Sequence, residues 1–386
     1  MLKILIAPSH YIIDPNYGTE YAWAYHIISG LSKYYEITAY TGKANCVIKG
    51  VKFIESKFYK KGLLNDLILP FKLYWEFKDK IKEYDALHYM FTLTPKAGYS
   101  LLSFKAKKLI LGPILYPSVA LTSTKPNIIS DKMLKYLKKI TFNLTDYFKL
   151  MTRMKADGLV FDSYKTFNLF KDIYKINYKD KIIKVIPFPI ETDIFKYKEF
   201  RKKEKINILS VSRLVYGKRI EVLIAAMSKV IKEFKNSNLI IANDGPMLPY
   251  LKKLVKKLEL EKFAQFIGRV PRYKLVKVYH SADIYVQPSQ IGGGFSFAIL
   301  EAMSCGLPII AANVGFMDEY LKHGVNCLLL RKADSEEISE AIIKLISDEE
   351  LRFKMGLENR KLAEEKFSVD KVQNEWIKFY EDVLSS

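Results

Sequence analysis

Cysteine is scarce in this sequence, and the few that occur form no metal-binding pattern. Cys46, Cys305 and Cys327 are the only three in 386 residues. Their spacing fits no zinc site, and an odd number leaves at least one thiol unpaired. We therefore expect reduced, structural cysteines, which are typical of a cytoplasmic protein.

Long apolar segments are also missing. The longest uncharged run of interest, residues 109–124, contains Gly112, Pro113 and Pro117, and it is shorter than a membrane-spanning helix requires. The first residues, MLKILIAP, have the pattern of a short strand and not of a signal peptide. These absences predict a cytoplasmic chain without a membrane span.

Acidic pairs of the kind that hold a nucleotide-bound metal are absent as well. No Asp-x-Asp triplet occurs in the chain, so the sequence offers no obvious pair of carboxylates for a divalent cation. We therefore expect that the protein needs neither a metal nor a cofactor.

Negative charge is in the minority, and its deficit is uneven. The chain has 62 basic and 42 acidic residues, a net charge of +20, and residues 1–200 alone contain 32 basic and 18 acidic residues. A field of this sign attracts polyanions, anionic headgroups or phosphate-bearing acceptors.

Short apolar runs, in contrast, recur along the whole chain, with helix-like segments between most of them. After residue 200 they lie at 206–211, 238–242, 263–267, 283–287, 308–312 and 327–330. In the first half they lie at 3–7, 35–40, 86–90, 108–111, 158–161 and 182–186. This alternation predicts an α/β protein with two parallel sheets, each covered by helices, joined near 187–204.

A glycine-rich turn stands between a strand-like run and a helix-like segment at residues 283–304. Gly292, Gly293 and Gly294 lack a Cβ and allow a ligand to approach the backbone. The helix that follows presents free N–H groups, which suit a phosphate, and carries Glu301, which can accept hydrogen bonds from sugar hydroxyls. Most such turns hold no ligand, so this segment alone is weak evidence.

Two cations follow an earlier apolar run. Arg213 and Lys218 stand between the run at 206–211 and a helix-like segment. The planar guanidinium of an arginine and the ammonium of a lysine together suit a diphosphate. An ordinary solvated loop in a basic protein is the alternative. A further turn, Asp244-Gly245-Pro246, lies between these two regions.

In combination, these motifs resemble the donor-binding domain of family 4 glycosyltransferases. The segment VIPFPIETDIF at 185–195 resembles the family's linker, and Gly18-Thr19-Glu20 resembles the glycine loop of its acceptor domain. The resemblance implies a GT-B fold, with two Rossmann-like domains facing across a cleft. It implies an acceptor domain over 1–190, a donor domain over 200–367, and a helix over 368–386 that returns to the first domain.

The same resemblance implies the site residues. Those for the donor, a nucleotide diphosphate-sugar, are Gly18, Arg213, Lys218, Gly245, Gly293, Gly294, Phe295, Ser296 and Glu301. Two of these positions depart from the family pattern: Gly293 stands where a first glutamate is usual, and Ser296 replaces a glycine. In the linker, Phe188 and Pro189 also stand where Asn and Gly are usual. The loss of that glutamate leaves nucleotide binding in place but puts the sugar identity, and even turnover, in question.

The resemblance further implies a retaining reaction in which the donor phosphate acts as the base, with Arg213, Lys218 and helix N-termini stabilising the leaving diphosphate. His88, which ends a strand-like run, is the candidate catalytic residue. A hydrogen-bonded structural histidine is the equal alternative.

The basic first half also contains an amphipathic segment at 131–155. It places Leu144, Phe148 and Met151 on one helical face with lysines nearby, as in helices that lie on anionic membranes. This favours a peripheral membrane contact and a saccharide or lipid-linked acceptor; a surface helix packed on its own domain is the alternative.

Two other functions stay open. One is a nucleotide-sugar epimerase on the same frame, which requires acid and base carboxylates and no acceptor. The other is a non-catalytic member that binds a nucleotide sugar or a polyanion, which the glycine at 293 and the net charge motivate.

Overall fold

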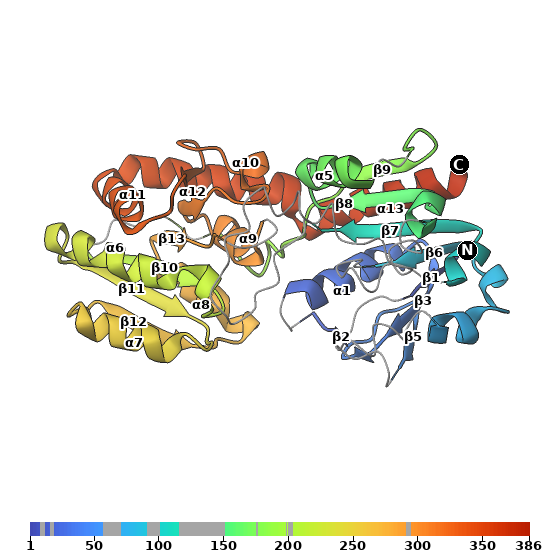
Figure 1. Cartoon of the computed structure of the whole chain (residues 1–386), viewed down its shortest axis with the longest axis horizontal. Coiled ribbons are helices and arrows are strands. Elements are labelled where there is room, and N and C mark those ends of the chain that lie inside the picture. Colours follow the sequence, from blue (N-terminus) through green and yellow to red (C-terminus); the bar gives the residue numbers. More distant parts are fainter. Residues whose placement is uncertain are drawn as a thin grey trace. The chain divides into compact units, whose positions relative to one another are not determined.

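The computed structural model (Figure 1) describes residues 1–7, 12–15, 19–56, 71–90, 101–115, 151–174, 177–197, 199, 204–290 and 295–386. The chain forms two compact units. Unit 1 contains the described residues up to Pro189 together with 369–386, and unit 2 spans Ile190–Ser368.

Unit 1 is built on a parallel seven-stranded sheet with the strand order β5-β3-β1-β6-β7-β8-β9. Its strands are β1 (Lys3–Ile6), β3 (Glu36–Thr41), β5 (Val51–Glu55), β6 (Ala86–Tyr89), β7 (Lys108–Ile114), β8 (Gly158–Phe161) and β9 (Ile182–Val185). The short strands β2 (Ile12–Ile13) and β4 (Lys43–Ala44) pair separately. The central strands are buried and mostly apolar because both faces of the sheet are covered.

The helices of unit 1 cover the two faces of this sheet. They include α1 (Thr19–Leu31), the 3₁₀ turns η1 (Ile81–Glu83) and η2 (Leu101–Lys105), α5 (Tyr164–Tyr174) and α13 (Val369–Ser385); residues 71–77 and 151–155 are also helical. Leu87 and Tyr89 of β6 pack into one core with Phe77 and Leu102. His88, between them in sequence, points to the opposite face, because side chains alternate along a strand.

Helix α13 belongs to unit 1 although it ends the chain. Val372, Trp376, Phe379 and Val383 recur at helical spacing and are all buried, as their pattern in the sequence indicates. The helix contacts α1 and β9. Gly158 of β8 lies so close to it that a Cβ there would come within 2.7 Å of Phe379 and Val383.

Unit 2 is built on a parallel six-stranded sheet with the order β12-β11-β10-β13-β14-β15. Its strands are β10 (Ile206–Val211), β11 (Ser237–Ala242), β12 (Ala264–Gly268), β13 (Ile284–Gln287), β14 (Ile309–Ala312) and β15 (Cys327–Leu330). Its helices are η3 (Tyr216–Lys218), α6 (Ile220–Glu233), α7 (Leu248–Lys257), α8 (Arg272–Ser281), α9 (Phe297–Ser304), α10 (Met317–Tyr320), α11 (Ser335–Ser347), α12 (Glu349–Leu362) and η4 (Ala363–Phe367).

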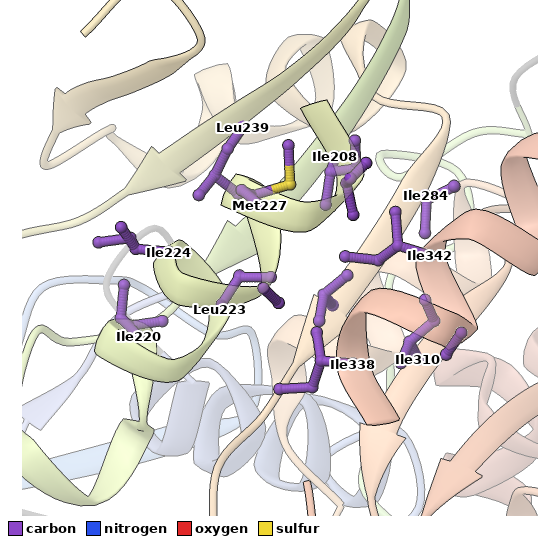
Figure 2. Close-up of a cluster of buried hydrophobic side chains, with 14 of the residues drawn as sticks. Ile208, Ile220, Leu223, Ile224, Met227, Leu239, Ile284, Ile310, Ile338 and Ile342 are labelled. Carbon is purple, nitrogen blue, oxygen red and sulfur yellow. The ribbon is translucent and has the colours of Figure 1, made fainter. Parts of the chain in front are cut away.

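One face of this sheet packs against α6, α7 and α11. Figure 2 shows Leu223 and Met227 of α6 among Ile208, Ile310 and Ile342 from two strands and α11. The opposite face carries α8 and α9, which receive the alternate strand residues such as Tyr285. The layers leave the carboxyl ends of the strands as the edge where polar loops gather, which is where ligands bind in such sheets.

The predicted fold class, two α/β domains with parallel sheets, is confirmed. Each apolar run predicted as a strand contains one, within one or two residues at most ends, except that β7 continues to Ile114. Strand β5 escaped prediction because Val51–Glu55 alternates with polar residues at the edge of the sheet. The chain crosses between units at 189/190 and at 368/369, beside the boundaries expected near 190–200 and at 367/368.

Candidate functional site

The loop after β10 carries two cations, Arg213 and Lys218, for which the described part of the chain offers no acidic partner. Arg213 is exposed and Lys218 ends η3 half-buried. Burial lowers the pKa of Lys218, and no acidic group offsets that effect. Among the described residues, no carboxylate lies within ion-pair distance of either side chain. Their neighbour Arg219 differs, because its guanidinium lies 3.6 Å from Glu221 and also bonds Gln290.

Gly245 locks the loops after β10 and β11 together. The amide of Leu214 donates to Asp244 O at 3.0 Å, and that of Met247 donates to Leu214 O at 3.0 Å. A Cβ on Gly245 would meet Leu214 O at 2.4 Å, closer than real contacts allow. The glycine is therefore required for the backbone of the two loops to approach, and it fixes the loop that carries Arg213.

A capped helix begins at the end of β13. The Ser296 hydroxyl accepts from the amide of Ile299 at 3.3 Å, which satisfies one of the free N–H groups of α9. It also donates to Gln287 Oε1 at 2.7 Å, which ties the helix start to the strand end. Phe295 is buried and stacks on Phe367 at 5.4 Å, inside the domain core. The glycines of the turn lie outside the described residues.

Glu301 of α9 belongs to a buried charge network. Its side chain is 4% exposed and accepts a hydrogen bond from Tyr279 OH at 2.8 Å. Arg272 lies 3.8 Å from the other carboxylate oxygen and donates to both oxygens of Glu191, at 3.0 and 2.6 Å. One arginine thus serves two carboxylates, and the fork fits the carboxylate of Glu191.

Burial raises the pKa of Glu301 to about 7, while Arg272 and then Tyr279 act in the opposite direction. Glu191, as a second carboxylate nearby, raises it further. Glu301 therefore titrates in the neutral pH range, and its charge depends on Arg272.

His88 lies in unit 1 with both ring nitrogens bonded. The carbonyl of Gly112 can only accept, so Nε2 donates to it at 2.8 Å, and Nδ1 accepts from Tyr380 OH at 2.6 Å. The side chain is fully buried, and burial lowers its pKa to about 4. This arrangement is that of a neutral structural histidine between β6 and α13; the catalytic role stays a prediction.

The structure thus brings five predicted residues to one edge of the unit 2 sheet. They follow the adjacent strands β11, β10 and β13 or belong to the helix after them: Arg213, Lys218, Gly245, Ser296 and Glu301. Gly18, Gly293 and Gly294 fall outside the described residues. The first part of the predicted amphipathic segment, residues 131–150, does so as well. The assignment of all these residues to the donor stays a prediction.

Sequence reasoning missed the partners of Glu301. Arg272 and Tyr279 lie on α8, and Glu191 follows the crossing between units, so no local spacing joins them to α9. The sequence offered one weak indication of this network, because Glu191 is an acidic residue inside the linker motif.

Within the described ranges, no group of three His, Cys, Asp or Glu side chains is placed to hold a metal ion. The same ranges contain no helix that is both long and apolar enough to cross a membrane.

Comparison with known proteins assigns the class. Residues 191–362 match the family described as glycosyl transferases group 1. An uncharacterized glycosyltransferase of Methanocaldococcus jannaschii is 32% identical over 288 residues, which are 74% of this chain and 71% of that protein. The chain therefore belongs to the glycosyltransferases and is a transferase enzyme.

Two further likenesses refine this picture. The N-acetyl-alpha-D-glucosaminyl L-malate synthase of Bacillus anthracis is 30% identical over 183 residues, and the match spans about half of either chain, 47% of each. The crystal structure of Anabaena HepE in complex with UDP has a TM-score of 0.71 at 18% identity and covers 99% of this chain and 100% of that one. The latter shows the shared GT-B fold. The family and the Methanocaldococcus relative are named as glycosyltransferases, and the other two names are consistent with that activity. Glycosyl transfer is therefore favoured over epimerisation.

Proposed function

We propose that this protein is a retaining, family 4 glycosyltransferase that transfers a sugar from a nucleotide diphosphate-sugar to a saccharide or lipid-linked acceptor in glycan biosynthesis. The observation that carries the proposal is a pair of cations at the carboxyl end of β10, Arg213 and half-buried Lys218, which no acidic side chain of the described residues neutralises. A cation that is partly desolvated and has no acidic partner lowers its free energy by binding an anion. The UDP named with HepE is an anion of the required kind.

The leaving diphosphate receives both cations, and its developing charge is stabilised without a metal. Ser296 and Gln287 fix the start of α9, so that its free N–H groups face the phosphates. Glu301 accepts hydrogen bonds from the nucleoside hydroxyls in its ionised form. The donor phosphate removes the proton from the acceptor hydroxyl, as the family resemblance implies.

The acceptor is the less constrained substrate. The name of the Bacillus anthracis relative, an N-acetyl-alpha-D-glucosaminyl L-malate synthase, indicates a small organic acid as the acceptor of that enzyme. The basic first half of this chain, in contrast, suits a larger anionic or lipid-linked acceptor. We therefore propose a peripheral position on the cytoplasmic face of a membrane.

Thermal unfolding with UDP, GDP and ADP tests the donor site, because a ligand that binds only the native state raises the apparent stability. Lys218→Ala removes a charge-assisted contact worth about 1.5–3 kcal/mol and is expected to weaken binding by about one to two orders of magnitude. Lys229→Ala is the matched control, since Lys229 is an exposed cation of α6 that already pairs with Glu336. Wild-type affinity of Lys218→Ala for every diphosphate that the protein binds would refute the assignment.

A further inference from the structure

Unit 1 exposes large apolar side chains on segments far apart in the sequence. Trp75 is 66% exposed, Phe71 52%, Met154 51% and Phe104 43%. The other two tryptophans of the chain, Trp23 and Trp376, are 0% and 1% exposed. A tryptophan so open to water loses the stabilisation that burial of its ring would give.

Cation–π contacts show that these segments lie against one another. Lys105 of η2 lies 5.2 Å from the ring centre of Tyr74, which is the neighbour of Trp75. Lys155, next to Met154, lies 6.0 Å from the ring of Phe104 and donates to Ser103 O at 2.6 Å. We call Phe71, Trp75, Phe104 and Met154, with Lys78, Lys105 and Lys155, the aromatic-basic surface.

Positive charge dominates around it. Segments 71–83, 101–108 and 151–155 contain nine basic and three acidic residues. The ammonium of Lys78 lies 4.2 Å from the ring centre of Trp75, so a cation is in contact with the exposed aromatic ring. Lys80, Lys82 and Lys105 are exposed.

We propose that the aromatic-basic surface is the face of unit 1 that binds an anionic lipid bilayer. Tryptophan and phenylalanine favour the headgroup level of a membrane, and lysines beside them meet the lipid phosphates. The charge is complementary to that of anionic lipids. The inference rests on the proposed membrane position of the enzyme and gives it a surface; it is independent of the donor site, which lies in unit 2.

The intrinsic fluorescence of Trp75 can report contact of this surface with a membrane. Because the other two tryptophans are buried, a change in intrinsic fluorescence on adding vesicles reports this side chain. With vesicles of equal phosphatidylglycerol and phosphatidylcholine at low salt, we expect a blue shift and protection from iodide quenching. Vesicles of phosphatidylcholine alone are expected to give much less, and salt is expected to reverse the shift.

Sedimentation with the same vesicles measures the binding itself. The triple variant Phe71→Ser, Trp75→Ser, Phe104→Ser is expected to bind at least about tenfold more weakly, since interfacial binding scales with the apolar area inserted. Tyr273→Ser in unit 2 is the matched control: Tyr273 is 67% exposed, with Lys274 at 5.7 Å from its ring. This control is expected to bind like the unmodified protein.

Three outcomes would overturn the inference: no fluorescence change with anionic vesicles at low salt, equal losses in the triple variant and the Tyr273→Ser control, or a Trp75 response to single-stranded nucleic acid but not to vesicles. Nucleoside diphosphate binding by the triple variant shows that the protein is folded. If that binding is normal while vesicle binding is lost, the donor site stands independently of the surface.

Discussion

At the scale of single residues, the charge of Glu301 is controlled from another helix. Arg272 holds two buried carboxylates, and its own side chain is 9% exposed. Without it, Glu191 and Glu301 would stand close together in a buried site with no cation between them, and breaking a buried ion pair in this way costs about 3–5 kcal/mol.

We expect Arg272→Gln to raise the pKa of Glu301 above about 7 and to move the pH dependence of donor binding with it. If ionised Glu301 accepts from the donor, affinity rises as the pH rises through about 7 in the unmodified protein. In Arg272→Gln the rise occurs at higher pH. Dissociation constants for the nucleoside diphosphate that binds, measured from pH 5.5 to about 8.5 across the neutral range, check this.

Tyr279→Phe is the control for this prediction, because it removes a hydrogen bond from Glu301 without changing any charge at neutral pH. Its shift is expected to have the same direction and to be smaller, as Arg272 is the larger of the two influences that lower the pKa. Superimposable profiles for Arg272→Gln and the unmodified protein would show that Arg272 has no positioning role.

The same pKa has a consequence for stability. The native state keeps a proton on Glu301 that the unfolded state releases above its ordinary pKa of 4.5. The contribution of this group to stability is therefore present below pH 4.5 and is lost as the pH rises through about 7. An ionised carboxylate at this buried position therefore costs stability, and such perturbed groups are typical of functional sites.

At the scale of elements, His88 joins strand β6 to helix α13. Tyr380 donates to it, and the ring of Trp376 lies 5.5 Å away. A proton on Nδ1 would require the Tyr380 hydroxyl to accept from the ring, so that this hydroxyl could no longer donate its own hydrogen to His88.

Acid is therefore expected to weaken this junction. The unfolded state takes up a proton near the ordinary pKa of 6.5, whereas native His88 does so only near 4. Above pH 6.5 the two states bind protons equally; stability falls by up to about 3 kcal/mol as the pH drops from 6.5 to about 4. Urea unfolding of the protein across this range, followed by the fluorescence of Trp23 and Trp376 in a Trp75→Phe background, measures it.

His88→Gln removes the titrating group and is expected to flatten this pH dependence, at the expense of stability at pH 7. A steep loss below pH 6.5 in His88→Gln that matches the parent would assign the effect to other groups. Activity of His88→Gln at pH 7, once corrected for the folded fraction, also separates the structural role from the catalytic prediction.

At the scale of the whole molecule, metal independence is the prediction that decides the reaction class. If Arg213 and Lys218 neutralise the leaving diphosphate as proposed, transfer is expected to survive EDTA with at most a modest loss. Abolition by EDTA and rescue by Mg²⁺ or Mn²⁺ would show that a bound cation, and not these side chains, neutralises the leaving group. Lys218→Ala serves as the internal comparison, since its rate should fall in the presence and in the absence of the chelator.

The fold was largely predictable because its signals are local. A strand buried on both faces must be apolar throughout, so runs such as 206–211 and 283–287 marked β10 and β13 within a residue. Strand β5 left no such run because its residues alternate between apolar and polar and none of them is fully buried.

The site was predictable in part for the same reason. Loops at the carboxyl ends of neighbouring parallel strands meet at one edge, so Arg213 and Gly245 were placed by topology once the strands were known. Neither the steric need for glycine at 245 nor the burial of Lys218 follows from spacing, because both depend on where a second loop or a neighbouring element packs.

What the sequence determined by itself is the class of the molecule: apolar periodicity specifies two parallel sheets, and the ordered motifs specify a glycosyltransferase. What only the tertiary structure decided is the state of individual groups. Glu301 meets Arg272 and Tyr279 across two helices, and His88 meets Tyr380 across 292 positions of sequence. Protonation depends on burial and on charges within a few ångströms, and such proximity exists only after the chain has folded.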